Sequence, residues 1–239
     1  TVRFAVVGQP GLSLLAWTTT PWTLPSNMGL AVGRDIDYVR VTTQDGEQLI
    51  LAASLVESVF RRHDSEIADV TPVPVDELIG LRYEPLFDYF SGFADEGAYR
   101  VVAAGFVSTD DGTGIVHIAP GFGEDDYQLG LAEGLPVVCP IDADCKFTDE
   151  IPDYEGEFVK DTDTPIIRRL RTSAQLFSEG SIEHAYPFCW RCDSPLIYRT
   201  ISTWFVKVEG KVKERMLAAN QSIWWIPEHI RDGRFGKGV

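Results

Sequence analysis

The chain has 239 residues, of which 44% are hydrophobic and 24% charged, a balance typical of a globular protein in water. No apolar run reaches the length that a membrane-spanning helix needs. The formal net charge of −15 argues against strong autonomous binding to nucleic acid, because proteins that grip phosphates carry a basic face. The chain can still receive the end of a nucleic acid that another domain holds, and acidity also serves solubility.

The chain begins with Thr1 and has no charged-then-apolar signal layout, so we interpret it as a segment of a longer protein. Its cysteines are too few for a disulfide scaffold in a chain of this length. Reduced thiols are the simpler interpretation, and we expect a cytoplasmic location. The four cysteines are Cys139, Cys145, Cys189 and Cys192.

Short β-favouring stretches dominate the first half of the chain. Residues 38–42 alternate in polarity, and an Asp-Gly turn leads into the apolar stretch 48–51, a pattern that predicts a β-hairpin. Pro72 and Pro74 are expected to break the chain. The other predicted strands cover residues 4–7, 14–17, 100–106 and 114–118.

Helix signals are fewer. Ser54 is a candidate N-cap for a short helix over 55–62, and Pro165 is a favourable start for a helix over 166–177. The chain has no repeat and no βαβ alternation, which predicts a β-rich α+β fold with a closed or near-closed β-barrel and peripheral helices. The other predicted helices cover residues 124–133 and 211–219.

The stretch from residue 181 to the C-terminus differs in composition from the rest of the chain. It contains the pair Cys189 and Cys192, a tryptophan-rich region predicted as strand, and basic residues near its end. We therefore divide the chain into a core over 1–180 and a connection over 181–239 that returns to a parent protein.

Residues 17–27, with the sequence WTTTPWTLPSN, are unusually rich in threonine, tryptophan and proline. Pro21 and Pro25 fix the backbone, and each threonine hydroxyl can both donate and accept a hydrogen bond. A stiffened segment of this kind suits the wall of a small polar pocket. Its composition by itself also fits an edge strand followed by a turn, because threonine favours strands.

This run resembles the threonine-rich peptide of isoleucyl-tRNA synthetase editing (CP1) domains. The related valyl and leucyl enzymes have a similar pocket in which two threonines are followed by Arg-Pro, whereas Thr-Pro-Trp-Thr stands at residues 20–23 here. The resemblance therefore favours the isoleucyl branch of the class Ia synthetases. It implies that residues 1–180 form the editing core and that 181–239 connects back to the synthetic core.

A second distinctive segment, residues 112–127 with the sequence GTGIVHIAPGFGEDDY, resembles the other editing-site motif of the same family. Its glycines permit close backbone approach, but no strand–loop–helix unit makes them a dinucleotide-binding fingerprint. Three further segments, 186–199, 203–208 and 227–237, resemble the family's return strand and the path to the synthetic core. The resemblance thus covers nearly the whole chain.

Asp126 is the candidate in the second segment for holding the substrate. We expect it in the first turn of a helix that begins near Glu124, where the helix dipole favours an ionised carboxylate. Spacing alone leaves Glu124 and Asp125 as alternatives, and any acid here also fits simple stabilisation of the helix terminus. The family pattern selects Asp126, whose carboxylate would hold the α-ammonium group of an aminoacyl ester by charge-assisted hydrogen bonds.

His117 lies nine residues before Asp126 in the sequence. A lone histidine is more often structural than functional, but the matching histidine of the family borders the pocket that receives the amino-acid side chain. Its ring there would exclude the larger isoleucine. Many family members have a second histidine where this chain has Phe122, so we expect no acid–base role for Phe122.

The resemblance implies hydrolysis of mischarged Val-tRNA(Ile), and it leaves open whether Val-AMP is also hydrolysed. Binding discriminates poorly between side chains that differ by one methylene, a limit for which isoleucyl-tRNA synthetase is itself the standard example, so a second sieve removes the smaller product. The sequence contains no Gly-x-Ser-x-Gly elbow, and we expect no covalent intermediate. Threonine hydroxyls and the terminal ribose hydroxyl of the substrate would position water.

The residues expected at this site come from both segments and from the C-terminal connection. The expected catalytic residues are Thr18, Thr19, Thr20 and Asp126. The expected substrate-binding residues are Trp17, Trp22, Thr23, Asn27, His117, Asp126 and, on weaker grounds, Tyr186.

The pair Cys189 and Cys192 has the spacing of a zinc knuckle, but a structural zinc site needs four ligands. The resemblance implies half of a zinc site whose partner pair lies upstream of the editing core, and we expect an orphan half-site without metal in this chain. Two reduced surface thiols explain the pair equally simply. We expect no cofactor for editing; zinc and ATP belong to the full-length enzyme, and this chain has no ATP-binding signature for amino-acid activation.

Three alternative functions remain open on the sequence. They are a non-catalytic module that binds the tRNA end, a zinc-knuckle interaction domain, and a valyl-type editing domain that clears threonine. The expected partners are the 3′ end of aminoacylated tRNA(Ile) and the rest of the parent synthetase. We expect a monomer with no membrane partner.

Overall fold

The computed structural model describes residues 1–61, 63, 65–180 and 186–238. The chain divides into two compact units, Thr1–Thr200 and Ile201–Val239. The sequence places the division at 180/181, where Ser181 lies outside the described residues, and that boundary stays a prediction.

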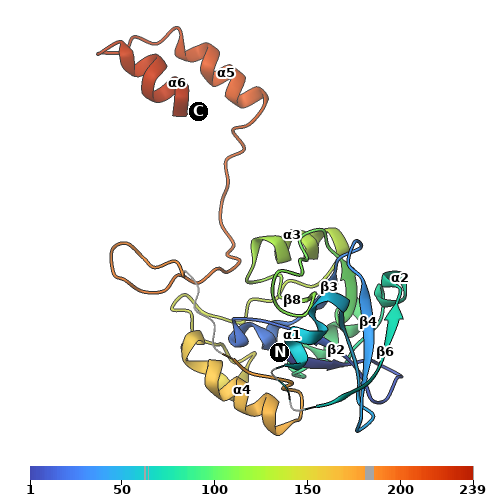
Figure 1. Cartoon of the computed structure of the whole chain (residues 1–239). Coiled ribbons are helices and arrows are strands. Elements are labelled where there is room, and N and C mark those ends of the chain that lie inside the picture. Colours follow the sequence, from blue (N-terminus) through green and yellow to red (C-terminus); the bar gives the residue numbers. More distant parts are fainter. Residues whose placement is uncertain (62, 64, 181–185, 239) are drawn as a thin grey trace. The chain divides into compact units, whose positions relative to one another are not determined.

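The first unit is built on two β-sheets (Figure 1). One has five strands in the order β1-β2-β5-β4-β6, and the other has three in the order β7-β3-β8. The pair β4–β5 is antiparallel, which confirms the hairpin predicted from the Asp-Gly turn. The strands are β1 Val2–Ala5, β2 Leu12–Ala16, β3 Gly29–Val32, β4 Tyr38–Thr43, β5 Gln48–Ala52, β6 Ile67–Val73, β7 Arg100–Ala103 and β8 Ile115–Ile118.

Three isolated β-bridges join the two sheets into a ring. Trp17, just after β2, bridges to Val116 in β8. On the other side, the segment after α2 (Val75–Leu78) bridges to β7 through Arg82 and to the chain just after β1 through Tyr83. The sequence prediction of a β-rich α+β fold is confirmed, and this ring is what brings the ends of β2 and β8 together.

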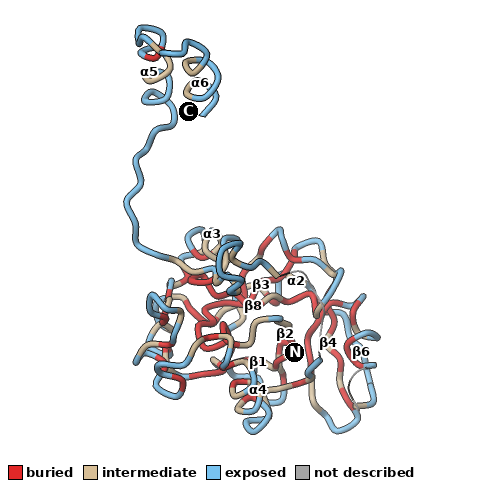
Figure 2. Tube along the Cα trace, turned by 90° about the vertical axis from the view of Figure 1, so that its left-hand side faces the viewer, coloured by how far each residue is buried: buried red, intermediate tan, exposed pale blue. Residues whose placement is uncertain are grey.

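The inner faces of the strands form the core of the first unit. Every residue of β3 is buried, and side chains such as Phe4, Leu14 and Leu49 are fully enclosed. Figure 2 shows the buried positions concentrated along these strands and the exposed positions at the surrounding turns. Removing this much apolar surface from water is the main term that stabilises the unit.

The prediction that Pro72 breaks the chain is wrong. β6 runs from Ile67 through Pro72 to Val73. It pairs with β4, and Pro72 lies opposite Val39 in that pairing. The strand lies at the edge of its sheet, where proline is tolerated because one row of backbone amides has no strand to bond. Six of its seven residues are exposed, so the apolar pattern of a buried strand is missing.

The helices of the first unit lie outside the sheets (Figure 1). The 124–133 helix is confirmed without change. The helices predicted over 55–62 and 166–177 need correction, the first here and the second below. Ser54 belongs to a 3₁₀ turn, Ala53–Leu55, rather than capping the next helix, and the predicted end at Arg62 lies outside the described residues. These helices are α1 Val56–Phe60, α2 Val75–Leu78, α3 Glu124–Glu133 and α4 Asp163–Thr172.

The helix predicted over 166–177 starts earlier and ends earlier, as α4. Pro165 lies in its first turn, where the missing amide costs no helical hydrogen bond. The helix stops because Ala174 adopts a positive φ of 58° and Leu176 pairs with Val2 of β1. Residues 173–177, which the sequence predicts as the last helical turn, therefore leave the helix, and Leu176 pairs with the edge strand β1 instead.

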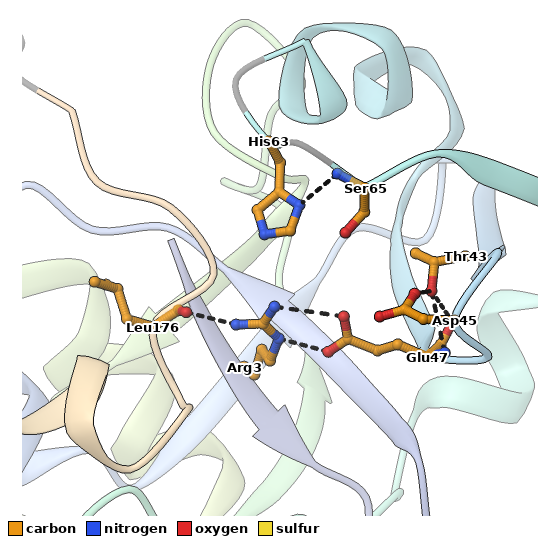
Figure 3. Close-up of polar contacts among 7 residues, drawn as sticks. All are labelled: Arg3, Thr43, Asp45, Glu47, His63, Ser65 and Leu176. Carbon is orange, nitrogen blue, oxygen red and sulfur yellow. Dashed lines mark hydrogen bonds and ion pairs between the residues drawn. The ribbon is translucent and has the colours of Figure 1, made fainter.

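Polar contacts fasten β1 to the turn before β5 and to the segment after α4 (Figure 3). Arg3 donates to the Glu47 carboxylate and to the carbonyl oxygen of Leu176. The Arg3 guanidinium also lies 4.9 Å from the ring centre of Phe177. In the same close-up, His63 accepts a hydrogen bond from the Ser65 amide.

The second unit is helical, with α5 Lys211–Asn220, a π-helical turn Arg231–Phe235 and α6 Gly236–Gly238. The prediction of a tryptophan-rich strand is wrong for its described residues, 201–238, which contain no strand. Trp204 and Trp224 are 99% and 95% exposed. Across the described residues, no helix combines the length and apolar composition that crossing a membrane requires.

Candidate active site

A cavity of about 540 Å³ opens where β2 and β8 end side by side. The bridge between Trp17 and Val116 is the contact that places the two distinctive sequence segments at this opening. Seven of the predicted site residues line it: Trp17, Thr18, Thr19, Thr20, Thr23, His117 and Asp126. The structure therefore brings both segments to one cavity.

The threonine wall is shaped by a turn of 3₁₀ helix, Pro21–Ser26, that follows β2. Pro21 occupies its first turn and fixes the backbone there. The Thr20 amide donates to Thr18 Oγ1 at 3.0 Å, and the Thr18 and Thr20 hydroxyl oxygens lie 3.2 Å apart. The wall thus presents hydroxyls of which those of Thr18 and Thr20 are held by contacts with each other, and such hydroxyls can hold a polar group or water at the cavity surface.

His117 is a buried residue of the cavity lining. Its Nε2 lies 3.1 Å from Thr23 Oγ1, and its Nδ1 lies 2.8 Å from the Asn27 side-chain nitrogen. The residue is only 7% exposed, and burial lowers the pKa of its imidazole to about 4. The ring is therefore neutral at physiological pH, because burial disfavours the charged form.

Asp126 is the acidic side chain that α3 contributes to the cavity lining. It lies in the first turn of α3, and its Oδ2 accepts a hydrogen bond of 2.8 Å from the Ala119 amide. Burial raises the pKa of its carboxyl to about 6, so the group is mostly ionised at pH 7. A Cβ at Gly123 would lie 3.1 Å from the Asp126 carboxyl carbon, which explains why a residue without a side chain precedes the helix.

The other two acids of this turn take no part in the cavity wall. Glu124 and Asp125 are exposed, and Glu124 accepts a hydrogen bond from Gln128 on the helix surface. The sequence left these residues as alternatives to Asp126. The structure directs only Asp126 to the cavity lining.

Trp22, Asn27 and Tyr186, which the sequence also predicts at the site, are not among the cavity-lining residues. Trp22 is buried and packs edge-on against Phe122, with ring centres 5.0 Å apart. Asn27 is 3% exposed and lies behind His117. Tyr186 lies beside Lys160, whose ammonium nitrogen is 4.3 Å from its ring centre.

Sequence reasoning missed part of the cavity lining. The loop before β8 contributes the apolar side chain of Phe106 and the acidic side chains of Asp110 and Asp111 to the lining. Because this loop directly precedes the 112–127 segment in the sequence, its closeness to that segment could have indicated a place at the site. Asp163 was also missed: it accepts a hydrogen bond from the Trp22 amide across 141 residues and has no local signal. The missed lining residues with side chains are Phe106, Ser108, Asp110, Asp111, Thr113, Ile115, Val116, Ala119 and Phe122.

The cysteine pair lies on a tight turn of the first unit. The Cys189 amide donates to the Ser194 carbonyl, and the Asp193 amide donates to the Cys189 carbonyl. The hydrogen bond with the Ser194 side chain lowers the pKa of the Cys192 thiol. Two thiols on one turn fit half of a tetrahedral zinc site, and the described residues contain no group of three or more side chains placed to hold a metal.

Two sequence relatives cover the chain almost completely. It is 51% identical over 237 residues to the isoleucine–tRNA ligase of Bdellovibrio bacteriovorus, with 99% of this chain covered. It is 52% identical over 238 residues to that of Treponema denticola, with 94% covered. The chain spans only 22% of the length of each relative. No protein-family model matches the chain.

Solved structures show the same fold. The crystal structure of GlLeuRS-CP1 superposes with a TM-score of 0.56, covering 75% of this chain and 98% of that one at 14% identity. The P. knowlesi cytosolic leucyl-tRNA synthetase editing domain gives a TM-score of 0.51, covering 70% and 84% at 14% identity. These likenesses establish the fold of the chain as that of CP1 editing domains.

Proposed function

The chain belongs to the isoleucine–tRNA ligase family and has the fold of its CP1 editing domain, and from this premise we propose that it hydrolyses valine from mischarged Val-tRNA(Ile). The observation that carries the proposal is the position of Asp126, a largely ionised carboxylate in a cavity walled by threonines and His117. An aminoacyl ester presents an α-ammonium group, which an ionised carboxylate binds through charge-assisted hydrogen bonds that are stronger than neutral ones.

Water is the nucleophile in this proposal. His117 contacts the Thr23 hydroxyl, but an imidazole whose pKa is lowered to about 4 is too weak a base to activate that hydroxyl at neutral pH. The hydroxyls of Thr18 and Thr20 would instead orient the attacking water and the ester, together with the terminal ribose hydroxyl of the tRNA. The contribution of the protein is then orientation and hydrogen bonding.

In this proposal, size selection follows from the position of His117 in the cavity lining. The His117 ring is held there on both nitrogens, so it cannot move aside for a larger side chain. Valine would fit against it, whereas the additional methylene of isoleucine would meet the ring. This arrangement supports a sieve that spares the correct product, as the limits of single-step discrimination require.

Replacing Asp126 tests the proposal directly. We expect Asp126→Ala to slow the deacylation of Val-tRNA(Ile) by about 10- to 100-fold, the loss of one charge-assisted hydrogen bond. Asp125→Asn is the matched control, because Asp125 lies in the same helical turn but is exposed. Equal rates for the Asp126→Ala variant and the unmodified chain would exclude Asp126 as the ammonium-binding group.

Two alternatives are separated by the same assay. A non-catalytic module for the tRNA end would bind Val-tRNA(Ile) without releasing valine. A valyl-type editing domain would release threonine from Thr-tRNA(Val) faster than valine from Val-tRNA(Ile). The sequence identity to isoleucine–tRNA ligases favours the isoleucyl substrate.

The remaining parts of the proposal concern partners and cofactors. The partners are the 3′ end of tRNA(Ile) and the rest of a parent synthetase. That parent would supply the basic tRNA-binding surface that a chain of net charge −15 lacks. Editing itself would need no cofactor, and the Cys189 and Cys192 pair would complete a zinc site only with ligands from elsewhere in the parent protein. We place the chain in the cytoplasm, as a monomer.

A further inference from the structure

Four buried polar side chains form a row that starts in the cavity lining, with Thr23 and His117, and continues behind it, with Asn27 and Tyr83. Tyr83, Asn27, Thr23 and His117 are 1%, 3%, 6% and 7% exposed. They come from four separate places in the fold: the bridging segment after α2, the residue after the 3₁₀ turn, the 3₁₀ turn itself and β8. Burying polar groups this deeply is costly unless hydrogen bonds satisfy them.

The direction of the hydrogen bonds in this row is fixed at Asn27. Its Oδ1 accepts from the Tyr83 hydroxyl at 2.6 Å, and its Nδ2 donates to the Gly29 carbonyl oxygen at 2.8 Å. The Gly29 carbonyl oxygen can only accept, so it determines which end of the amide is nitrogen, and the Tyr83 hydroxyl then donates to the oxygen end. The Nδ2 also lies 2.8 Å from His117 Nδ1. Because an amide nitrogen only donates, His117 Nδ1 must accept and carry no proton.

The rest of the row follows from that assignment. A neutral imidazole without a proton on Nδ1 carries it on Nε2, so His117 donates to Thr23 Oγ1 at 3.1 Å. The Thr23 hydroxyl in turn donates to the carbonyl oxygen of Thr20 at 2.8 Å. Thr23 Oγ1 keeps one acceptor site, and the Thr20 hydroxyl lies 3.4 Å from it.

We propose that Asn27 and Tyr83 are positioning residues that fix His117 as the Nε2–H tautomer and so set the direction of the hydroxyls on the threonine wall. In this arrangement His117 presents a donor to Thr23 and has no free acceptor for substrate or water. It serves as a rigid boundary of the cavity. The value of this arrangement for editing rests on the proposed function, whereas the proton positions do not.

Nitrogen-15 NMR of the histidine rings in the 239-residue chain tests this assignment. The chain has four histidines, and a His117→Gln variant identifies the signals of His117. At pH 7 we expect the proton of His117 on Nε2 only. A wild-type ring protonated on Nδ1 overturns the proposal without need of any variant.

Asn27→Asp is the informative substitution because it keeps the shape of the side chain and replaces the donor by an acceptor. We expect the His117 ring in this variant to carry a proton on Nδ1, facing the new carboxylate. Asn220→Asp is the matched control, since Asn220 is also buried but bonds to Arg231 and Trp225 in the second unit. An unchanged His117 spectrum in the folded Asn27→Asp variant would show that Asn27 does not set the tautomer.

Deacylation of Val-tRNA(Ile), measured on the same wild-type sample, separates this inference from the proposed function. An Nε2–H ring in an inactive chain supports the inference and contradicts the function. An Nδ1–H ring in an active chain does the reverse.

Discussion

His117 Nε2 lies 3.1 Å from Thr23 Oγ1, although 94 residues separate the two in the sequence. The contact joins the threonine wall to β8, and it exists because β3 pairs with β8 so that Leu30 stands opposite His117. The cavity is therefore a product of strand register. A shift of one residue in that pairing would turn His117 to the other face of the sheet.

Deacylation should depend on pH through Asp126. Burial raises the pKa of this carboxyl to about 6, and the protonated form cannot attract an ammonium group. We expect kcat/KM for Val-tRNA(Ile) to fall about tenfold per pH unit below pH 6, because a single proton is taken up. The pKa of His117 is lowered to about 4 by burial and contributes nothing in this range.

Asp125→Asn refines the same experiment. The charge of Asp125 helps to raise the pKa of Asp126, so its removal should move the midpoint of the pH profile to lower pH. Rates measured between pH 5 and pH 7 check both expectations. A flat profile over this range would show that Asp126 is not the titrating group.

Asp126→Asn should stabilise the fold while it removes activity. Burial raises the pKa of Asp126, so its ionised form is less stable in the folded chain than in the unfolded chain. The new amide can still accept from Ala119. We expect the free energy of unfolding at pH 7 to rise by on the order of 1 to 3 kcal/mol.

The sign of this effect sets its pH range. A carboxyl whose pKa is raised from 3.8 to about 6 contributes stability that is fully present below pH 3.8 and is lost as the pH rises through 6. The variant and the wild type should therefore converge towards pH 4 in urea unfolding and differ most above pH 6. A constant difference across this range would point to packing instead of ionisation.

The exclusion of isoleucine by size is tested with the correctly charged product, Ile-tRNA(Ile). His117→Ala and Thr20→Ala each remove side-chain atoms from the cavity lining, and we expect deacylation of Ile-tRNA(Ile) to rise by about tenfold or more in each. His63→Ala is the control, because His63 stacks on Phe177 outside the cavity. If Ile-tRNA(Ile) stays protected in both cavity variants, another part of the lining excludes isoleucine.

Tyr83→Phe should destabilise the chain more than a matched change at the surface. The Tyr83 hydroxyl is fully buried, and its loss leaves Asn27 Oδ1 without its donor, which costs about 1 to 3 kcal/mol. Tyr89→Phe removes a hydroxyl that donates to Asp153 in a partly exposed position, and it should cost less than about 1 kcal/mol. Denaturant unfolding of both variants measures the difference, and equal losses would contradict a buried network.

Much of the fold could be predicted from local patterns. The α3 helix was predicted at its observed bounds because glycines stand at both ends, and the β4–β5 hairpin was predicted from its turn. The errors have tertiary causes. Pro72 is accommodated only because β6 is an edge strand, and α4 ends early because Leu176 pairs beside β1.

The sequence by itself predicted two candidate site segments, 17–27 and 112–127, through their resemblance to the motifs of a family, because such motifs are local properties of the chain. Only the tertiary structure decided which side chains of those segments reach the cavity. It turned Asp126 inward and Asp125 outward on one helical turn, and it placed Asn27 behind His117 as a support. The physical reason is that direction, burial and hydrogen-bond partners are set by contacts across dozens of residues. The same contacts shift the pKa values of Asp126 and His117, which no local pattern records.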